Sequence, residues 1–259
     1  MSDPGDRRPM LVLEHIGCES PAAYEDELRA HGVAPRRVRL HEGEELPDWR
    51  EHQGIVAMGG PMGVHDEEQH PWLAAEKRLI GEAVRAGTPY WGVCLGAQLL
   101  AASLGARVSA GPAPEVGVFP VALTPPAARD PVFGDLPDSF PAFHWHGDTY
   151  ELPDGAVGLA RSERYEQQAF VFQRAYAIQF HLEVDAALVA QWCEVPAYAN
   201  DLRKLPGEGP AGALLEALAA IESEAMARAR TIFGRWLMST GDEGRKAMSP
   251  RHTAGRAGR

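Results

Sequence analysis

Short apolar runs alternate with helix-like stretches over residues 10–106, and this alternation restricts the fold more than any other feature of the sequence. Strands are predicted over 10–16, 37–42, 54–61 and 89–94. Helical spacing and terminal Pro or Gly residues predict helices over 21–32, 70–87 and 96–106. Strands that alternate with helices pair in parallel, with the helices on the faces of the sheet. The sequence therefore predicts an α/β fold: a doubly wound, mostly parallel sheet with helices on both faces.

The pattern changes after residue 107. Short strand-like runs separated by Pro and Gly predict antiparallel additions to the same sheet and a return strand, over 115–124, 156–162, 167–173 and 175–181. Helices are expected over 185–194 and, as one long helix, over 211–238. An apolar stripe on the long helix predicts a packing face, either on the parent domain or on a partner chain. The stripe consists of Leu214, Leu218, Ile221, Met226, Ile232, Phe233 and Trp236.

These patterns divide the chain into four parts. We expect a flexible N-terminus (1–9), an α/β domain (10–194), a C-terminal helical extension (195–239) and a disordered tail (240–259). The tail is basic and lies in a Gly-, Ser- and Pro-rich context, which is typical of a solvated segment.

Charge and cysteine content exclude several classes of function. The formal net charge is −11, and an acidic chain repels phosphate backbones, so general nucleic-acid binding is not expected. No association with membranes is expected either. Three cysteines without a CxxC pair argue against a disulfide framework and predict a protein of the reducing cytoplasm.

One of these cysteines, Cys94, lies in the motif Gly-x-Cys-x-Gly at 92–96, between a predicted strand and a predicted helix. Free backbone N–H groups at a helix N-terminus favour a thiolate, and the glycines permit a sharp turn and close approach of a substrate. The motif therefore predicts a nucleophile. A buried cysteine is also often an inert apolar side chain, so the motif alone leaves both interpretations open.

Two further motifs follow predicted strands. His181 and Glu183 in QFHLEV are two positions apart, so they share one face, and they can act as a base and the carboxylate that orients it. The motif GGP at 59–61 follows another apolar strand. Because ligands collect at the carboxyl ends of parallel strands, we expect the backbone N–H groups of Gly60 and Leu95 to stabilise an oxyanion near Cys94.

In combination, these motifs resemble those of the class I glutamine amidotransferases, most closely the glutaminase domain of GMP synthetase. The segments GGPMGV, PYWGVCLGAQLLAASLGA, HWHGDTYELP and AIQFHLE carry the resemblance, which covers roughly residues 10–185. It implies a doubly wound α/β domain in which Cys94 is the nucleophile, His181 the base and Glu183 its orienting carboxylate. It also implies a substrate pocket, with Gln98 at the amino-acid end of the substrate; the pocket residues are Gly59, Pro61, Gln98, His144, Trp145 and His146.

No cofactor or metal is expected. His144 and His146 have the spacing of a pair of metal ligands, but the sequence offers no clear third ligand, so we interpret them as pocket-wall or structural residues.

Three functions remain open. The chain can hydrolyse glutamine and deliver ammonia to a separate synthase, with the C-terminal helix as the docking surface or as the contact of a homo-oligomer. It can act alone as a γ-glutamyl peptide or amide hydrolase. It can also be a non-catalytic glutamine-binding or scaffolding module. After residue 185 the chain carries no second catalytic domain, so the resemblance implies glutaminase chemistry in a free-standing chain rather than GMP synthesis.

Overall fold

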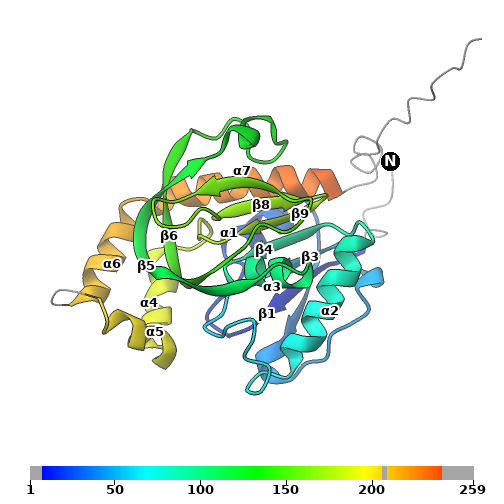
Figure 1. The fold of residues 1–259 in the computed structure, drawn as a ribbon, viewed down its shortest axis with the longest axis horizontal. Helices are drawn as coiled ribbons and strands as arrows, with labels where there is room; N and C mark the ends of the chain where they lie inside the picture. Colours follow the sequence, from blue (N-terminus) through cyan, green and yellow to red (C-terminus); the bar gives the residue numbers. More distant parts are fainter. Residues whose placement is uncertain (1–7, 206–208, 241–259) are drawn as a thin grey trace, which may run out of the picture.

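The computed structural model describes residues 8–205 and 209–240, and within these ranges nine strands form one sheet with seven α-helices around it (Figure 1). The strands are β1 (Met10–Glu14), β2 (Pro35–Arg39), β3 (Gly54–Ala57), β4 (Tyr90–Val93), β5 (Val108–Leu123), β6 (Ser139–Tyr150), β7 (Val157–Arg161), β8 (Ala169–Phe172) and β9 (Ala175–Ile178). The helices are α1 (Ala23–Ala30), α2 (Trp72–Arg85), α3 (Leu95–Ser103), α4 (Ala186–Glu194), α5 (Pro196–Leu202), α6 (Pro210–Ala219) and α7 (Glu222–Thr240). Apart from residues 8, 9 and 240, the predicted flexible N-terminus and basic tail lie outside the described residues.

The sheet has a parallel half and an antiparallel half. Its order is β2-β1-β3-β4-β9-β8-β7-β5-β6, and the first five strands run parallel while the remaining pairs are antiparallel. This confirms the predicted α/β fold, the antiparallel additions and the return strand, which is β9. Because β1, β3, β4 and β9 are parallel, the segments that follow them lie at one edge of the sheet.

The predicted strands differ from the structure in their bounds, and one strand was missed. The strand predicted over 37–42 ends at Arg39, and Leu40–Glu42 forms a single 3₁₀ turn. Gly43 closes this turn in the left-handed conformation (φ 83°), where a glycine is unstrained, and its N–H donates to the Leu40 carbonyl. The long strand β6 was not predicted, because Pro141 and Gly147 interrupt its pattern.

Helices cover both faces of the sheet, and neighbouring residues of β4 point into different cores. Tyr90 packs with residues of α2 and α3, whereas Trp91 packs with residues of α1 and α7. The Trp91 ring lies 5.3 Å from the Phe233 ring and 5.5 Å from the Trp236 ring, measured between centroids. The apolar stripe of the C-terminal helix therefore packs on its own chain.

The prediction of one helix over 211–238 is wrong, because the helix breaks between Ala219 and Glu222. Its apolar residues have two destinations: Leu214 and Leu218 of α6 pack with α4 and α5, while the residues of α7 reach the core beside β4. A straight helix cannot reach both. Figure 1 shows α4, α5 and α6 together at the end of the molecule beside β5 and β6.

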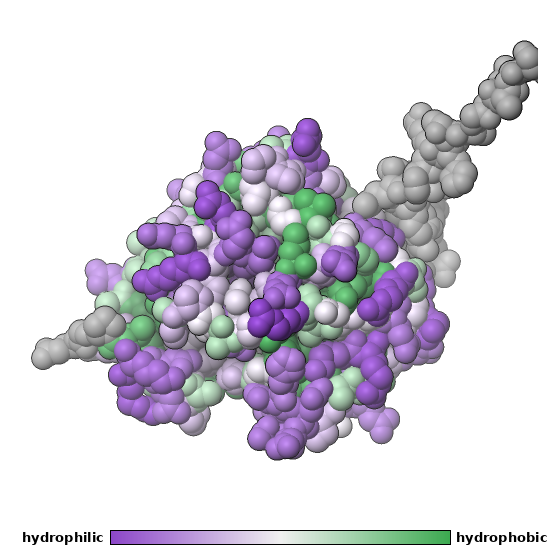
Figure 2. All heavy atoms as spheres, viewed as in Figure 1, coloured by the Kyte–Doolittle hydropathy of each residue, from purple (hydrophilic) through white to green (hydrophobic). Residues whose placement is uncertain are grey.

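The distribution of apolar residues shows a largely hydrophilic surface in the view of Figure 2. In the view of Figure 2, hydrophilic residues predominate and apolar residues occur in small separate areas. The stretch 86–106 contains no charged residue, but it is divided between β4 and α3 and does not form one long helix. Among the described residues, no helix combines the length and hydropathy that crossing a bilayer requires.

Candidate active site

Cys94 lies at the turn between β4 and α3, with φ 52° and ψ −106°, a conformation that a non-glycine residue rarely adopts. The two flanking glycines are required sterically. A Cβ on Gly92 would lie 2.5 Å from the Gly96 carbonyl oxygen, and a Cβ on Gly96 would lie 2.2 Å from the Ala57 carbonyl oxygen. The tight turn presents the side chain of Cys94, which is 7% exposed, at the N-terminus of α3.

His181 and Glu183 follow β9 and form a buried pair. The His181 Nδ1 and the Glu183 Oε1 are 2.7 Å apart, and each residue is 1% exposed. The second carboxylate oxygen accepts a hydrogen bond from the Leu182 backbone N–H at 3.0 Å. Backbone hydrogen bonds to Phe143 of β6 fix His181 in place. The carboxylate therefore holds Nδ1 and leaves Nε2 as the nitrogen available for chemistry.

The two side chains at the centre of the site shift each other's pKa. Burial raises the pKa of the Cys94 thiol, and the interaction with His181 offsets this rise only in part. Burial lowers the pKa of His181, but Glu183 and then Cys94 raise it well above its ordinary value. Among the described residues, the His181 Nε2 has no hydrogen-bond partner of good geometry, and the Cys94 thiol contacts the Trp145 carbonyl at 3.7 Å. Glu183 thus favours a proton on the imidazole beside the sulfur.

The segment after β3 lies against Cys94. A Cβ on Gly59 would be 3.4 Å from the Cys94 Cβ, and a Cβ on Gly60 would be 3.1 Å from the Leu95 Cδ2. The structure therefore brings the predicted oxyanion segment, the nucleophile position and the start of α3 together. A side chain at Gly59 would displace the Glu19 carboxylate, and one at Gly60 would displace the Met62 side chain.

A buried imidazole orients this segment. The His15 Nδ1 donates to the Gly59 carbonyl at 3.1 Å, and the His15 Nε2 lies 2.9 Å from the Glu76 Oε1. Burial lowers the pKa of His15, but the interaction with Glu76 raises it, and the pKa lies above its ordinary value. In a planar trans peptide the C=O and the following N–H point in opposite directions. By holding the Gly59 carbonyl, His15 fixes the direction of the Gly60 N–H.

Sequence reasoning missed Glu19, which lies beyond β1 at the same edge of the sheet. It is 2% exposed, and the Tyr198 hydroxyl donates to its Oε1. Its Oε2 would be 1.9 Å from a Cβ on Gly59, which places the carboxylate next to the oxyanion segment. Burial raises the pKa of Glu19 to about 7, and His181 lowers it less strongly. The signal available in the sequence was its position just after a parallel strand.

Two other predicted pocket residues have neighbours outside the Cys94–His181 pair. Gln98 is buried on α3 and donates from Nε2 to the Gln179 Oε1 at 3.2 Å. Pro61 lines an open pocket of about 520 Å³ together with His15, Met62 and Ala197.

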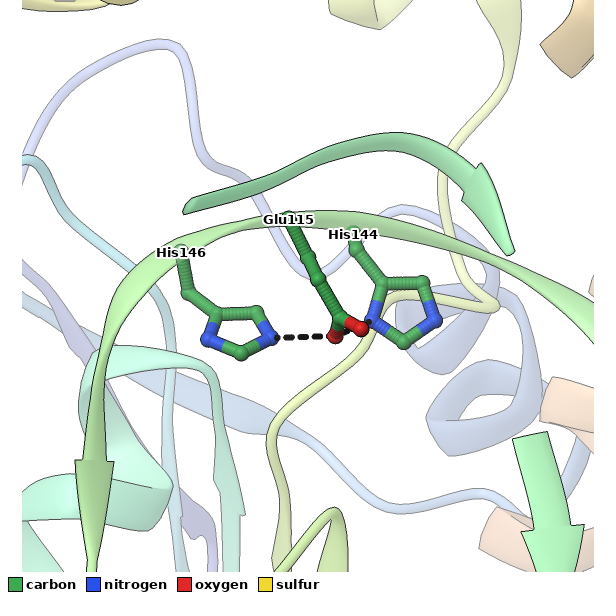
Figure 3. Close-up of side chains that lie close together, drawn as sticks. All are labelled: Glu115, His144 and His146. Carbon is green, nitrogen blue, oxygen red and sulfur yellow. Dashed lines mark ion pairs between the residues drawn. The ribbon is translucent and has the colours of Figure 1, made fainter. Parts of the chain in front are cut away.

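The side chains of His144 and His146 belong to a separate buried cluster with Glu115 of β5 (Figure 3). The Glu115 Oε2 is 3.3 Å from the His144 Nδ1 and 3.2 Å from the His146 Nε2. Burial raises the pKa of Glu115, but the interactions with the two imidazoles lower it, and the pKa lies below its ordinary value. Burial lowers the pKa of His144. Glu115 is a third candidate ligand, which the sequence did not reveal.

The comparisons with known proteins agree on one family. The model of the family "glutamine amidotransferase class-I" matches residues 22–188. The glutamine amidotransferase-like protein YfeJ of Salmonella typhimurium is 34% identical over 174 residues, which cover 65% of this chain and 73% of that protein. The GMP synthase of Wolinella succinogenes is 31% identical over 190 residues, covering 69% of this chain but only 34% of the synthase.

Solved structures give the same result at the level of the whole fold. The crystal structure of a glutamine amidotransferase from Thermotoga maritima has a TM-score of 0.79 at 33% identity, covering 88% of this chain and 97% of that one. A glutamine amidotransferase from Methylobacillus flagellatus has a TM-score of 0.81 at 28% identity, covering 90% and 95%.

Proposed function

Because the chain belongs to the class I glutamine amidotransferase family, as its motifs predicted, we propose that it hydrolyses the γ-amide of glutamine through a thioester on Cys94. The observation that carries the proposal is the 2.7 Å pair of His181 and Glu183 beside a cysteine on a strained strand-to-helix turn. A buried cysteine without a catalytic role does not require this combination.

In the proposed first step, the His181 Nε2 takes the thiol proton of Cys94, and the resulting thiolate attacks the γ-carboxamide carbon. Glu183 keeps the imidazole in the required tautomer and stabilises its protonated form. The N–H groups of Gly60 and Leu95 hold the tetrahedral oxyanion, and loss of one such donor typically reduces the rate by about 10²–10³. His181 then donates its proton to the departing amine.

In the proposed second step, water attacks the γ-glutamyl thioester with His181 as the base, and glutamate is released. The roles proposed for Gly59, Pro61 and Gln98, and for the backbone of 144–146, are to position the glutamyl group. Ammonia is delivered to an acceptor or synthase that remains to be identified. The chain spans about a third of the GMP synthase, so GMP synthesis is not proposed.

The test combines trapping with turnover. A glutamine-analogue electrophile should label Cys94, and labelling should be slowed by glutamine. Cys94→Ser should reduce glutamine hydrolysis by about 10³-fold or more. Cys193→Ser, which changes a half-buried cysteine outside the site, is the matched control. Unchanged hydrolysis in Cys94→Ser would refute the proposal, and a folded wild type that binds glutamine without hydrolysing it would favour the non-catalytic module.

A second candidate is a stand-alone γ-glutamyl peptide or amide hydrolase. Two observations favour it: the helix face considered for docking is buried in the chain's own core, and an open pocket lies beside Pro61 with room for a leaving group larger than ammonia. Rapid turnover of γ-glutamyl peptides by the purified protein would support this candidate. Weak glutaminase activity that increases with an added synthase would support the first.

A further inference from the structure

The cluster of Glu115, His144 and His146 lies where four segments meet. His144 and His146 alternate on β6 and so share a face, and Glu115 is the register partner of His146 on β5. Ser162 and Gln168, beyond β7 and before β8, complete the surroundings. All three members of the cluster are at most 6% exposed.

The hydrogen bond of His146 Nδ1 leaves the lone pair of Nε2 facing the cluster. Its Nδ1 lies 3.0 Å from the Asp148 carbonyl oxygen, which can only accept, so Nδ1 carries the proton. In the neutral ring Nε2 is then unprotonated. Ligating histidines characteristically donate their other N–H to a backbone carbonyl in this way.

The contacts within the cluster are close but are not directed hydrogen bonds. The His144 Nδ1 lies 3.3 Å from the Glu115 Oε2, yet neither nitrogen of His144 has a hydrogen-bond partner of good geometry among the described residues. The His146 Nε2 lies 3.2 Å from the same oxygen. A lone pair of the His146 Nε2 that faces this carboxylate oxygen is repelled by it unless a cation or a proton lies between them.

Gln168 supplies a fourth vertex. Its Nε2 is 2.8 Å from the Glu115 Oε2 and 3.3 Å from the His146 Nε2, while its buried Oε1 has no hydrogen-bond partner among the described residues. A half-turn of the amide exchanges the two atoms and places the oxygen among the other donors. A tetrahedral zinc site with bonds of about 2.0–2.1 Å has donor–donor edges of about 3.3 Å. Of the four separations known among these atoms, three, at 3.3, 3.2 and 3.3 Å, are close to this value, and the Gln168–Glu115 separation of 2.8 Å is shorter. The ligand atoms of Glu115, His144 and His146 all lie within 4.8 Å of one another.

The charges around the Glu115 carboxylate also indicate a cation site. The side chains that contact the Glu115 carboxylate are Ser162, Gln168 and the two imidazoles, and none of them has a fixed positive charge. Buried carboxylates are normally paired with a cation or coordinate a metal.

We propose that Glu115, His144 and His146 bind one divalent ion of the zinc class, with the amide oxygen of Gln168 as the fourth ligand. The ligands are buried and leave no open position, so the ion is structural. Between the two histidines, Trp145 presents its carbonyl to the Cys94 sulfur. The ion therefore anchors the part of β6 that lies against the nucleophile.

The test measures zinc binding in a Cys94→Ser background, because a thiolate beside His181 can itself bind zinc. The protein is stripped with a chelator and titrated with Zn²⁺ against a chromophoric competitor, and bound metal is counted after desalting. We expect one equivalent in Cys94→Ser, loss of that equivalent on adding Glu115→Gln, and its retention on adding Glu183→Gln. Gel filtration and circular dichroism establish that each variant is folded.

If Glu115→Gln does not fold, Co²⁺ in the Cys94→Ser protein gives an independent measurement, because a tetrahedral site produces a strong visible band that octahedral sites do not. The proposal is overturned if Cys94→Ser binds no equivalent, if Glu115→Gln retains it, or if Co²⁺ gives no such band. Those results would leave Glu115 as a buried carboxylate held by Ser162, Gln168 and the two imidazoles without an ion.

Discussion

Two buried imidazole–carboxylate groups lie near Cys94, and their geometry differs in one decisive respect. Glu183 holds one imidazole by a directed 2.7 Å bond, which leaves a single nitrogen free beside the sulfur. Glu115 lies 3.2–3.3 Å from two imidazoles without a directed hydrogen bond to either. Similar side chains at similar burial therefore suit different tasks: the first can move a proton, and the second can hold a cation.

A third buried pair sharpens the comparison. His15 donates to the Gly59 carbonyl just as His146 donates to the Asp148 carbonyl, and the Nε2 of each ring lies within 3.2 Å of a glutamate oxygen. The His15–Glu76 bond is directed and 2.9 Å long, so a protonated ring accounts for it. The contact of His146 with Glu115 is longer, at 3.2 Å, and is not a directed hydrogen bond, which is the difference that the proposed ion accounts for.

The largest expected effect comes from Glu183→Gln. The glutamine amide can donate to Nδ1 and hold His181 in the wrong tautomer, and the equivalent change in a serine protease lowers kcat by about 10⁴. We expect a fall in kcat of about 10²–10⁴, measured as glutamate released at saturating glutamine. A fall of less than tenfold would mean that Glu183 does not orient the base.

Gly59→Ala should have the next largest effect. The new Cβ would lie 1.9 Å from the Glu19 Oε2 and 3.4 Å from the Cys94 Cβ, so either the carboxylate or the oxyanion segment must move. We expect kcat to fall by about 10²-fold, comparable to the loss of an oxyanion donor. Gly63→Ala is the control, because a Cβ there meets nothing closer than 3.4 Å. Equal activity of the two variants would contradict the placement of the oxyanion segment.

Glu76→Gln should have a smaller effect, because Glu76 acts through His15 rather than on the substrate. Without the carboxylate, the Gly59 carbonyl is held less firmly and the Gly60 N–H is less well aligned. We expect kcat to fall by about tenfold with little change in KM, since the interaction matters in the transition state. Glu82→Gln, at an exposed position of the same helix, is the matched control. A change in KM alone would argue that Glu76 affects substrate binding instead.

The features predicted correctly from the sequence were those encoded locally. The strained turn at Cys94 requires glycines two positions away on either side, and His181 and Glu183 are neighbours on one segment. Their convergence followed from the parallel order of the strands that precede them.

The features that were missed depend on contacts between distant segments. Glu115 meets His146 only through the register of β5 and β6, which shifts between Ala110 and Glu115. Glu19 lies in a loop without periodicity, and its role depends on Gly59 and Tyr198. The break between α6 and α7 depends on two separate packing destinations rather than on a helix-breaking residue.

The last expected effect is on stability rather than on rate and concerns Glu19, a buried carboxylate that accepts a hydrogen bond from the Tyr198 hydroxyl. Its pKa in the folded protein is about 7, raised by burial from the ordinary 4.5. Below pH 4.5 both states are protonated and there is no penalty. As the pH rises from 4.5 to 7, the unfolded state releases its proton first, so the folded state loses stability, by at most about 3 kcal/mol.

Glu19→Gln removes this loss, and the amide oxygen of the new side chain can still accept a hydrogen bond from Tyr198. The Tm of the variant minus that of the wild type should therefore increase between pH 5 and pH 8, with Glu82→Gln as the control for the change in net charge. A difference that stays constant or decreases over this range would show that Glu19 is ionised in the folded protein, as a carboxylate paired with His181 would be.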